Sequence, residues 1–463
     1  MESFIALCLL LGLGHLLRMK VRLLQKLYLP SCVIAGLIGL VIVQLAGDAA
    51  WVDTWTAGWN KIPGVLINIV FACLFLGVTL PSIGKLFRKA GPQLAYGQVV
   101  AWGQYFVGIG VVLVVVAPML ADLPLAGRRM FGGLIPVGFE GGHGTASGLA
   151  STFSDLGWEA GKDFAMASAT AGVLSAILVG MILVNWASRK GYVSKRRNTA
   201  DISADEQAGI IPHLSRPSAG KLTVSSDAIE TLTLHLAVIG LAMLFGWALK
   251  QGMMAGVRLV YSGLPDEQVQ ATTLYRLVRP FPMFPLCMIG GLLIQVIEQR
   301  FDRHRLIDGA LMTRIQGTAL DFLVVPAIAM ISVATFKGLV LPFVLLIGVG
   351  ILWNVFCVTV LARRVLPDAW FERSIAEMGQ SMGVTATGLL LLRVVDPDYE
   401  TPAAEAFAAK QMMHEPFMGG GLWTSTAIPL LALWGGWPVL GIACGAMAVW
   451  LVILFDAKRN RRT

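Results

Sequence analysis

A phrase of small and hydroxyl residues occurs twice in this chain, each time in an apolar region. Residues 145–149 read Thr-Ala-Ser-Gly-Leu, and residues 385–389 read Thr-Ala-Thr-Gly-Leu; a glycine-rich stretch precedes each copy. Glycine lets the backbone turn and approach a ligand closely, and hydroxyl oxygens suit a hard cation such as Na⁺. Interrupted apolar segments at matching places in two halves of a chain indicate the binding site of a secondary transporter.

The two phrases predict ligands for an anionic substrate and for Na⁺. Backbone N–H groups at a helix N-terminus favour a carboxylate, whereas carbonyl oxygens at the end of a broken helix favour Na⁺. The alternative is that the small residues only permit close helix packing. The expected substrate-binding residues are Gly142, Gly144, Thr145, Gly383, Thr385, Arg393 and Arg314. The expected Na⁺ ligands are Thr145, Ser147, Thr385, Thr387, Asp321 and Glu415.

Ionisable residues inside apolar segments are the second chemical signal, because each costs about 2.5–3.5 kcal/mol at the centre of a transmembrane helix. Arg314 and Asp321 are seven residues apart and share one helical face, which we expect to point inward. Near Pro416 we expect a bent or unwound helix, because proline removes a backbone hydrogen bond. The full set is Glu140, His143, Arg314, Asp321, Glu377, Arg393, Lys410, His414 and Glu415.

Three of these residues have more than one interpretation. Glu140 and His143 are possible proton carriers. Glu140 can instead balance the charge of a bound cation or accept hydrogen bonds that stabilise its own segment, and His143 can form a structural hydrogen bond. Arg393 either binds a carboxylate or extends its charged end to the membrane surface.

The composition places these residues in a membrane protein. Hydrophobic residues make up 56% of the chain and charged residues 14%, with a mean hydropathy of +0.71, whereas a soluble domain has about 25% charged residues. The basic residues behind the net charge of +8 lie in short connections, which is typical of cytoplasmic loops and not of a nucleic-acid interface. The expected partners are therefore the lipid bilayer, a small anionic solute and Na⁺, and no nucleic acid.

Eleven apolar segments of near membrane-spanning length position the two phrases. The glycine-rich segment 129–155 lies between the fourth and fifth of them, and the segment 370–394 lies between the ninth and tenth. The eleven segments cover about 3–17, 28–47, 63–83, 93–120, 160–187, 230–250, 280–298, 314–335, 338–362, 402–432 and 436–456.

This order predicts an all-α polytopic membrane protein with two inverted-topology repeats. Each repeat would hold five transmembrane helices and one re-entrant helical hairpin, and an extra helix would end the chain. The expected parts are a first repeat over 1–187, a cytoplasmic linker over 188–229, a second repeat over 230–432, and an extra helix with a basic tail over 433–463.

Basic residues predict the orientation in the membrane. They follow the first, third, fifth, seventh and ninth spans and close the chain, which places the N-terminus outside and the C-terminus in the cytoplasm. The segment 251–279 does not fit, because Arg258, Arg276 and Arg279 would then be external. Since five spans per half is an odd number, the two halves enter the membrane from opposite sides.

The stretch from Glu140 to Ala146, Glu-Gly-Gly-His-Gly-Thr-Ala, resembles the glycine-rich hairpin of the bacterial sodium/glutamate symporter family. The second glycine-rich segment and the chain length are similar too. The resemblance implies Na⁺-coupled glutamate uptake across the bacterial inner membrane. More distant citrate carriers share the inverted-repeat plan, which implies a homodimeric scaffold and a moving transport domain, an elevator mechanism. The family residues that carry over by position are Gly141, Gly142, His143, Gly144, Thr145, Gly379, Gly383 and Thr385.

The chain also departs from this family pattern. The sequence after Thr145 differs from that of the well-known glutamate carriers, and the second segment has another glycine and proline pattern. These differences place the chain in a divergent branch, for which transport and fold follow more directly than glutamate as the substrate.

Other functions remain to be weighed against this one. A proton-coupled carrier or exporter of another organic anion would use Glu140, His143, His414 or Glu415 as the titrating group. An enzyme is disfavoured, because the sequence contains no HExxH, no GxSxG and no metal-spaced Cys/His cluster. A passive channel is disfavoured as well, since nothing in the sequence suggests a continuous polar pore.

Overall fold

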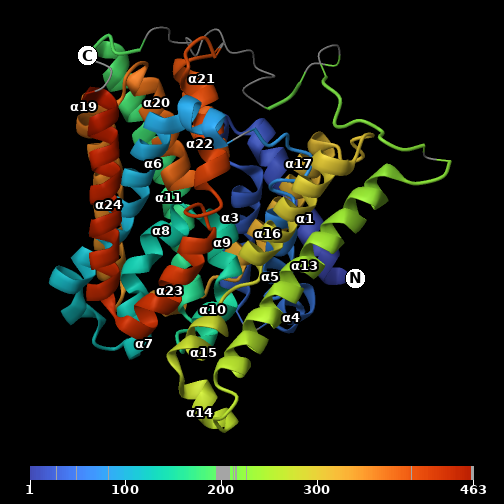
Figure 1. Cartoon of the computed structure of the whole chain (residues 1–463), viewed down its shortest axis with the longest axis vertical. Coiled ribbons are helices and arrows are strands. Elements are labelled where there is room, and N and C mark those ends of the chain that lie inside the picture. Colours follow the sequence, from blue (N-terminus) through green and yellow to red (C-terminus); the bar gives the residue numbers. More distant parts are fainter. Residues whose placement is uncertain are drawn as a thin grey trace.

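The computed structural model describes residues 1–27, 29–47, 49–81, 83–193, 209–211, 213, 216–225, 227–397 and 399–459. Within these ranges every regular element is a helix, and eight helices are long and apolar enough to cross a membrane (Figure 1). The prediction of an all-α polytopic membrane protein is therefore confirmed. The eight lie on α1 (Glu2–Lys20), α6 (Ile83–Val111) with its extension to Leu120, α11 (Gly161–Arg189), α13 (Thr231–Val260), α16 (Phe284–Phe301), α17 (Gly309–Ala329), α18 (Val340–Phe356) with its extension to Val365, and α24 (Gly436–Arg459).

Three of the eleven predicted spans are shorter or interrupted in the structure. The span at 28–47 is a 16-residue helix, α3 (Ser31–Ala46), and the span at 402–432 is divided into α22 (Ala403–His414) and α23 (Leu422–Trp434). The division falls at Pro416 and the three glycines that follow, as expected. The continuous span over 63–83 was wrong: α5 (Ile62–Ala72) ends early, and at Gly77 the backbone has a φ of +73° that a helix cannot contain.

Short helices connect the long ones or extend them. Both α6 and α18 continue into a π-helix, over Val112–Val116 and Cys357–Ala362. The remaining helices are α2 (Arg22–Lys26), α4 (Ala50–Trp55), the 3₁₀ turn Ala117–Leu120, α7 (Leu125–Met130), the 3₁₀ turn Phe131–Gly133, α8 (Leu134–Gly138), α9 (Gly142–Gly148), α10 (Ala150–Asp155), α14 (Asp266–Ala271), α15 (Thr273–Val278), the 3₁₀ turn Val333–Phe336, α19 (Arg363–Val365), α20 (Trp370–Gly383) and α21 (Thr385–Val395).

The helices pack in two groups that lie side by side (Figure 1). The first group contains α1, α3, α5, α13, α16 and α17, and the second contains α6, α8, α11, α18 and α20 to α24. Glycines allow close approach in the first group: a Cβ on Gly290 would overlap the carbonyl oxygen of Ala242 in α13, and a Cβ on Gly291 would overlap that of Ala72 in α5. Small residues have this role in membrane helix packing.

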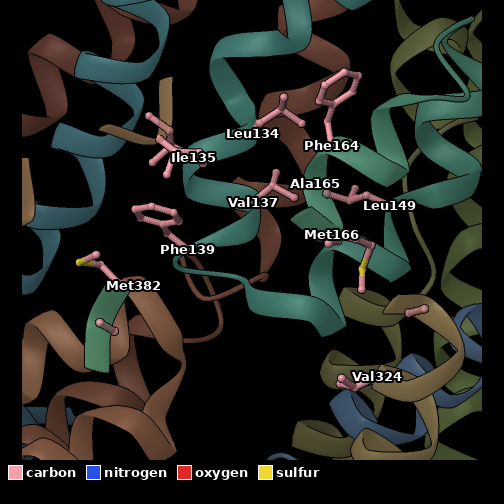
Figure 2. Packing of buried hydrophobic residues seen from close by; sticks show 14 of the residues in the cluster. Leu134, Ile135, Val137, Phe139, Leu149, Phe164, Ala165, Met166, Val324 and Met382 are labelled. Carbon is pink, nitrogen blue, oxygen red and sulfur yellow. The ribbon is translucent and has the colours of Figure 1, made fainter. Parts of the chain in front are cut away.

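Apolar side chains fill the space around α8 inside the second group. Figure 2 shows Phe139 with Ile135 of α8 and Met382 of α20 nearby, and Leu134 of α8 near Phe164 of α11. All of these side chains are buried. This packing holds α8, α9, α11 and the end of α20 in fixed positions around the glycine-rich segment.

Part of the predicted orientation rests on residues that the structure does not describe. Asp201, Asp205 and Glu206 in the linker, and Lys195, Arg196, Arg197, Arg461 and Arg462, lie outside the described residues. The placement of the termini therefore stays a prediction.

Candidate functional site

The first glycine-rich segment is a helix interrupted in its middle. Helix α8 ends at Gly138, the backbone turns over residues 139–141, and α9 begins at Gly142, whose φ is +63°. A residue with a side chain rarely adopts this conformation, so glycine is required here. The interruption lies inside the predicted segment 129–155 and leaves backbone polar groups of two helix ends without helical partners.

The second segment is interrupted at one residue. Helices α20 and α21 meet at Val384, whose φ of 101° is outside the usual range for a β-branched residue. The two helices pack closely beside this turn, since a Cβ on Gly379 would lie 2.7 Å from the Cα of Gly388. The chain therefore doubles back within the predicted segment 370–394.

The two interruptions lie against each other. A Cβ on Gly142 would be 2.7 Å from Cγ1 of Val384. A third irregular stretch, between α22 and α23, reaches the same place, because a Cβ on Gly420 would overlap Oγ1 of Thr145. Three breaks in helical structure thus converge on one small volume.

The hydroxyl groups that were predicted as ligands differ in their hydrogen bonding. The hydroxyl oxygen of Thr145 is buried without a hydrogen-bond partner. Ser147 donates to the sulfur of Met166, and Thr387 donates to the carbonyl oxygen of Gly383 at 3.3 Å. Thr385 accepts a hydrogen bond of 2.6 Å from Nε2 of Gln411. Gly142, Gly144 and Gly383 are buried beside them.

The remaining predicted residues differ in position: Arg314 and Arg393 lie apart from the breaks, whereas Glu415 is part of the third one. Arg314 is exposed on α17, about two turns from Leu320, the residue of that helix that lies near Gly144. Arg393 is exposed in the last turn of α21. Asp321 is half-buried on α17, and Glu415 is half-buried directly after α22.

The surroundings of His143 are those of a histidine that forms a structural hydrogen bond. Its ring is buried, and Nε2 lies 3.0 Å from the hydroxyl oxygen of Thr170. Thr170 in turn donates to the carbonyl oxygen of Met166 at 3.1 Å, so it can accept the imidazole N–H. These bonds attach the start of α9 to α11.

Glu140, at the first break, is hydrogen-bonded to two residues far away in sequence. Its Oε2 accepts from Nε2 of Gln380 at 2.8 Å and lies 3.2 Å from Nε2 of His414. Nδ1 of His414 faces Nε2 of Gln98 at 3.2 Å. An imidazole protonated on Nε2 alone satisfies both contacts, because Gln98 donates to Nδ1 and Nε2 donates to the carboxylate. In this arrangement neither residue that directly contacts Glu140 is charged.

Two of the buried oxygens that have no hydrogen-bond partner lie at the first break. They are Oε1 of Glu140 and Oγ1 of Thr145, which come from the two sides of the first break. Unpaired buried oxygens are costly, and a carboxylate and a hydroxyl are both hard ligands. The residues at this break thus fit a bound Na⁺.

A second cluster lies one helical turn away, around the ammonium group of Lys410. Nζ donates to Oε1 of Glu377 at 2.6 Å, to Oε1 of Gln411 at 2.8 Å and to Oε1 of Gln380 at 2.9 Å. Oε2 of Glu377 accepts from Gln93 at 2.8 Å. Because Gln380 also donates to Glu140, the two clusters form one buried network.

Sequence analysis identified only the ionisable residues of this network. Glu377, Lys410 and His414 stand out as charged or titratable residues in apolar segments, whereas the glutamines did not enter the prediction. A usable signal was present on α6, where Gln93 and Gln104 are eleven residues apart and hence on one helical face. Gln104 donates to the carbonyl oxygen of Ser381 at 2.6 Å.

A cavity of about 330 Å³ lies between the two helix groups, next to α9. Its wall includes Ser147 from α9, Asn68 from α5 and the amine groups of Lys61 and Lys162. Lys162 donates to Asn60 at 3.3 Å. The two lysines make this lining basic, which favours an anionic solute.

Comparison with known proteins identifies one family. A family model described as the sodium/glutamate symporter matches residues 1–400. No curated protein and no solved structure matches the chain. Lys410, Gln411 and His414 lie beyond the matched residues.

Proposed function

Because the chain belongs to the sodium/glutamate symporter family, we propose that it imports glutamate, or a related acidic amino acid or carboxylate, together with Na⁺. The observation that carries this proposal is the meeting of Gly142 and Val384, which joins two helix breaks in one buried volume. Freed backbone groups at such breaks bind the substrate and coupling ions of secondary transporters. The protein is a multi-pass membrane protein, and we place it in the bacterial inner membrane with a cytoplasmic C-terminus.

Substrate and ion would bind on different sides of the breaks. The first turn of α21 offers backbone N–H groups and the Thr385 hydroxyl to a substrate carboxylate, and Gly142, Gly144 and Gly383 leave room for it. Na⁺ would bind Glu140 and Thr145, whose free oxygens are buried together with the Ser147 and Thr387 hydroxyls. Arg314 and Arg393 have no part in this arrangement, because both are exposed away from the breaks.

The packing order supports an inverted repeat. If α1, α3, α5, α6 and α11 correspond to α13, α16, α17, α18 and α22–α23, the largest contacts among these helices have matching ones. The pair α1 and α3 matches α13 and α16, and the pair α3 and α17 matches α16 and α5. The corresponding helices α6 and α18 also both end in a π-helix. α24 has no counterpart in this scheme.

This division also supports an elevator mechanism. The breaks and the polar network belong to the second helix group or to α9, which packs against α8 and α11 of that group and against α5 and α17 of the first. We propose that this group moves as one body and carries the bound solute along the first group. The first group would form the scaffold and the homodimer interface.

Gradient-driven uptake tests the proposed function. Proteoliposomes holding the full chain are expected to accumulate labelled glutamate under an inward Na⁺ gradient, and aspartate should compete. A matched pH gradient without Na⁺ should give no accumulation above liposomes without protein. No Na⁺-driven accumulation of glutamate or of other acidic amino acids and carboxylates would reject the proposal.

Thr145→Val is expected to weaken Na⁺ activation about tenfold, because it removes a free buried oxygen worth about 1–2 kcal/mol as an ion ligand. Thr385→Val should instead raise the KM for substrate, since its hydroxyl lies at the start of α21. The measurement is initial uptake against Na⁺ and against glutamate. Thr426→Val is the control, because that hydroxyl only donates to the carbonyl oxygen of Leu422. Unchanged Na⁺ activation in Thr145→Val would remove this residue from the ion site.

The Glu140–His414 contact favours one second candidate, a proton-coupled carrier or exporter of another organic anion. A buried carboxylate and an imidazole in contact can exchange a proton with the transport cycle. The same liposomes distinguish the two functions: accumulation or efflux that follows the pH gradient, and not the Na⁺ gradient, would favour the second.

A further inference from the structure

Lys410 has the surroundings of a bound monovalent cation. Its side chain is fully buried, and all three N–H donors of the ammonium meet side-chain oxygens at 2.6–2.9 Å. One oxygen is a carboxylate, from Glu377, and two are amide oxygens, from Gln380 and Gln411. A carboxylate with neutral oxygens is also the usual ligand set for a hard metal cation.

The surrounding helices hold these oxygens in place and leave space for the Lys410 side chain. Glu377 and Gln380 come from α20 and Lys410 and Gln411 from α22, while Gln93 of α6 holds the second oxygen of Glu377. Gly97 of α6 leaves the necessary space, since a Cβ there would lie 2.5 Å both from Oε1 of Glu377 and from Cε of Lys410. The oxygens are thus fixed from three helices before any solute arrives.

We propose that Lys410 is a tethered cation that permanently fills a monovalent-cation site made by Glu377, Gln380 and Gln411. The site then binds no free ion during transport, and the chain couples one cation fewer than it would with a neutral residue at position 410. The inference rests on the proposed function for its effect on coupling, but the site itself is defined by the contacts alone.

The charges around the site support this assignment. Glu377 and Lys410 neutralise each other at 2.6 Å, whereas Glu140 faces an imidazole whose Nδ1 accepts a hydrogen bond and is therefore uncharged. Ion coupling is left to Glu140, and Gln380 connects the filled site to this one by touching both Lys410 and Glu140. A structural ion pair would also offer three acceptors to a buried ammonium, so the variants below separate the two roles.

Removal of the Lys410 ammonium group tests the proposal. Lys410→Ala removes the ammonium and leaves Glu377 unpaired, which destabilises a buried pair strongly. The full-chain variant is purified in choline chloride, and its Tm is followed while choline is replaced by Na⁺ or by methylammonium. We expect Tm to rise by at least about 3 °C more than in the wild type, with saturation. Na⁺ activation of uptake should become steeper, with the Hill coefficient higher by about one.

The double variant Glu377→Gln, Lys410→Ala is the matched control, because it lacks the carboxylate and should lose the additional Tm shift. A Lys410→Ala chain with the wild-type salt response, one that stays unfolded in both Na⁺ and methylammonium, or a shift that persists in the double variant would each overturn the proposal. The Tm readout needs no transported substrate. A failure of Na⁺-driven uptake of all the acidic solutes tested would therefore reject the proposed function, and the Tm result would still test the cation site.

Discussion

Glu140→Gln is expected to abolish Na⁺-driven uptake while the chain still folds. The glutamine keeps an oxygen that can accept from Gln380, but the negative charge at the first break is lost. A charge-assisted contact is worth about 3 kcal/mol, so the Na⁺ affinity should fall about 100-fold. Initial uptake measured against Na⁺ concentration at saturating substrate checks this result.

The control for this variant is Glu298→Gln in the first helix group. Glu298 is half-buried and accepts from Nε2 of Gln295 at 2.7 Å, so it loses a similar carboxylate–amide bond far from the breaks. Its Na⁺ dependence should stay unchanged. If Glu140→Gln keeps the wild-type Na⁺ affinity but loses a pH dependence of uptake, Glu140 carries a proton and not the sodium charge.

The effect expected at Glu140 depends on contacts that the spacing of residues in the sequence cannot predict. Glu140 is separated from Gln380 by 240 residues and from His414 by 274. The sequence identified the acid as unusual because of its apolar surroundings, and that inference concerns one residue at a time. Which partner it meets depends on how the two glycine-rich segments pack, and this is a property of the whole chain.

Helical periodicity predicts which residues share a face of a helix, but it does not predict which face is buried. Arg314 and Asp321 do share a face of α17, but Arg314 is exposed. In a soluble helix the charged face points to water, whereas in a membrane helix it is expected to point to the bundle, and the choice depends on the neighbours. The prediction for Arg314 used the second rule near the start of α17, only five residues after it begins.

The segments that contain the helix breaks were easier to predict from the sequence than the residues that make the turns. Glycine and hydroxyl residues predicted interruptions within 129–155 and 370–394, and the structure has them at 139–142 and at Val384. The second turn is made by a valine with positive φ, which no propensity would select. Such strain persists only where the surrounding packing imposes it, and it occurs often at functional sites.

Gly142→Ala is expected to reduce uptake at least tenfold, because the two helix breaks can no longer approach each other. The substitution places a methyl group in a backbone conformation with φ of +63°, which costs about 1–2 kcal/mol, and 2.7 Å from Cγ1 of Val384. Either Val384 or α9 must shift, and the freed backbone groups that would hold the solute shift with it. Initial uptake and Tm are measured on the same preparation.

Gly157→Ala separates the two causes, because Gly157 has a similar φ of +82° with no atom within 4 Å of the added Cβ. It should lower Tm by a similar amount and leave uptake intact. Val384→Ala in the Gly142→Ala background removes Cγ1 and should restore a large part of the uptake without restoring all of the Tm, as a coupled pair in a double-mutant cycle does. If the two variants instead add independently, the breaks do not act together, and the substrate volume must be sought in the cavity beside Ser147.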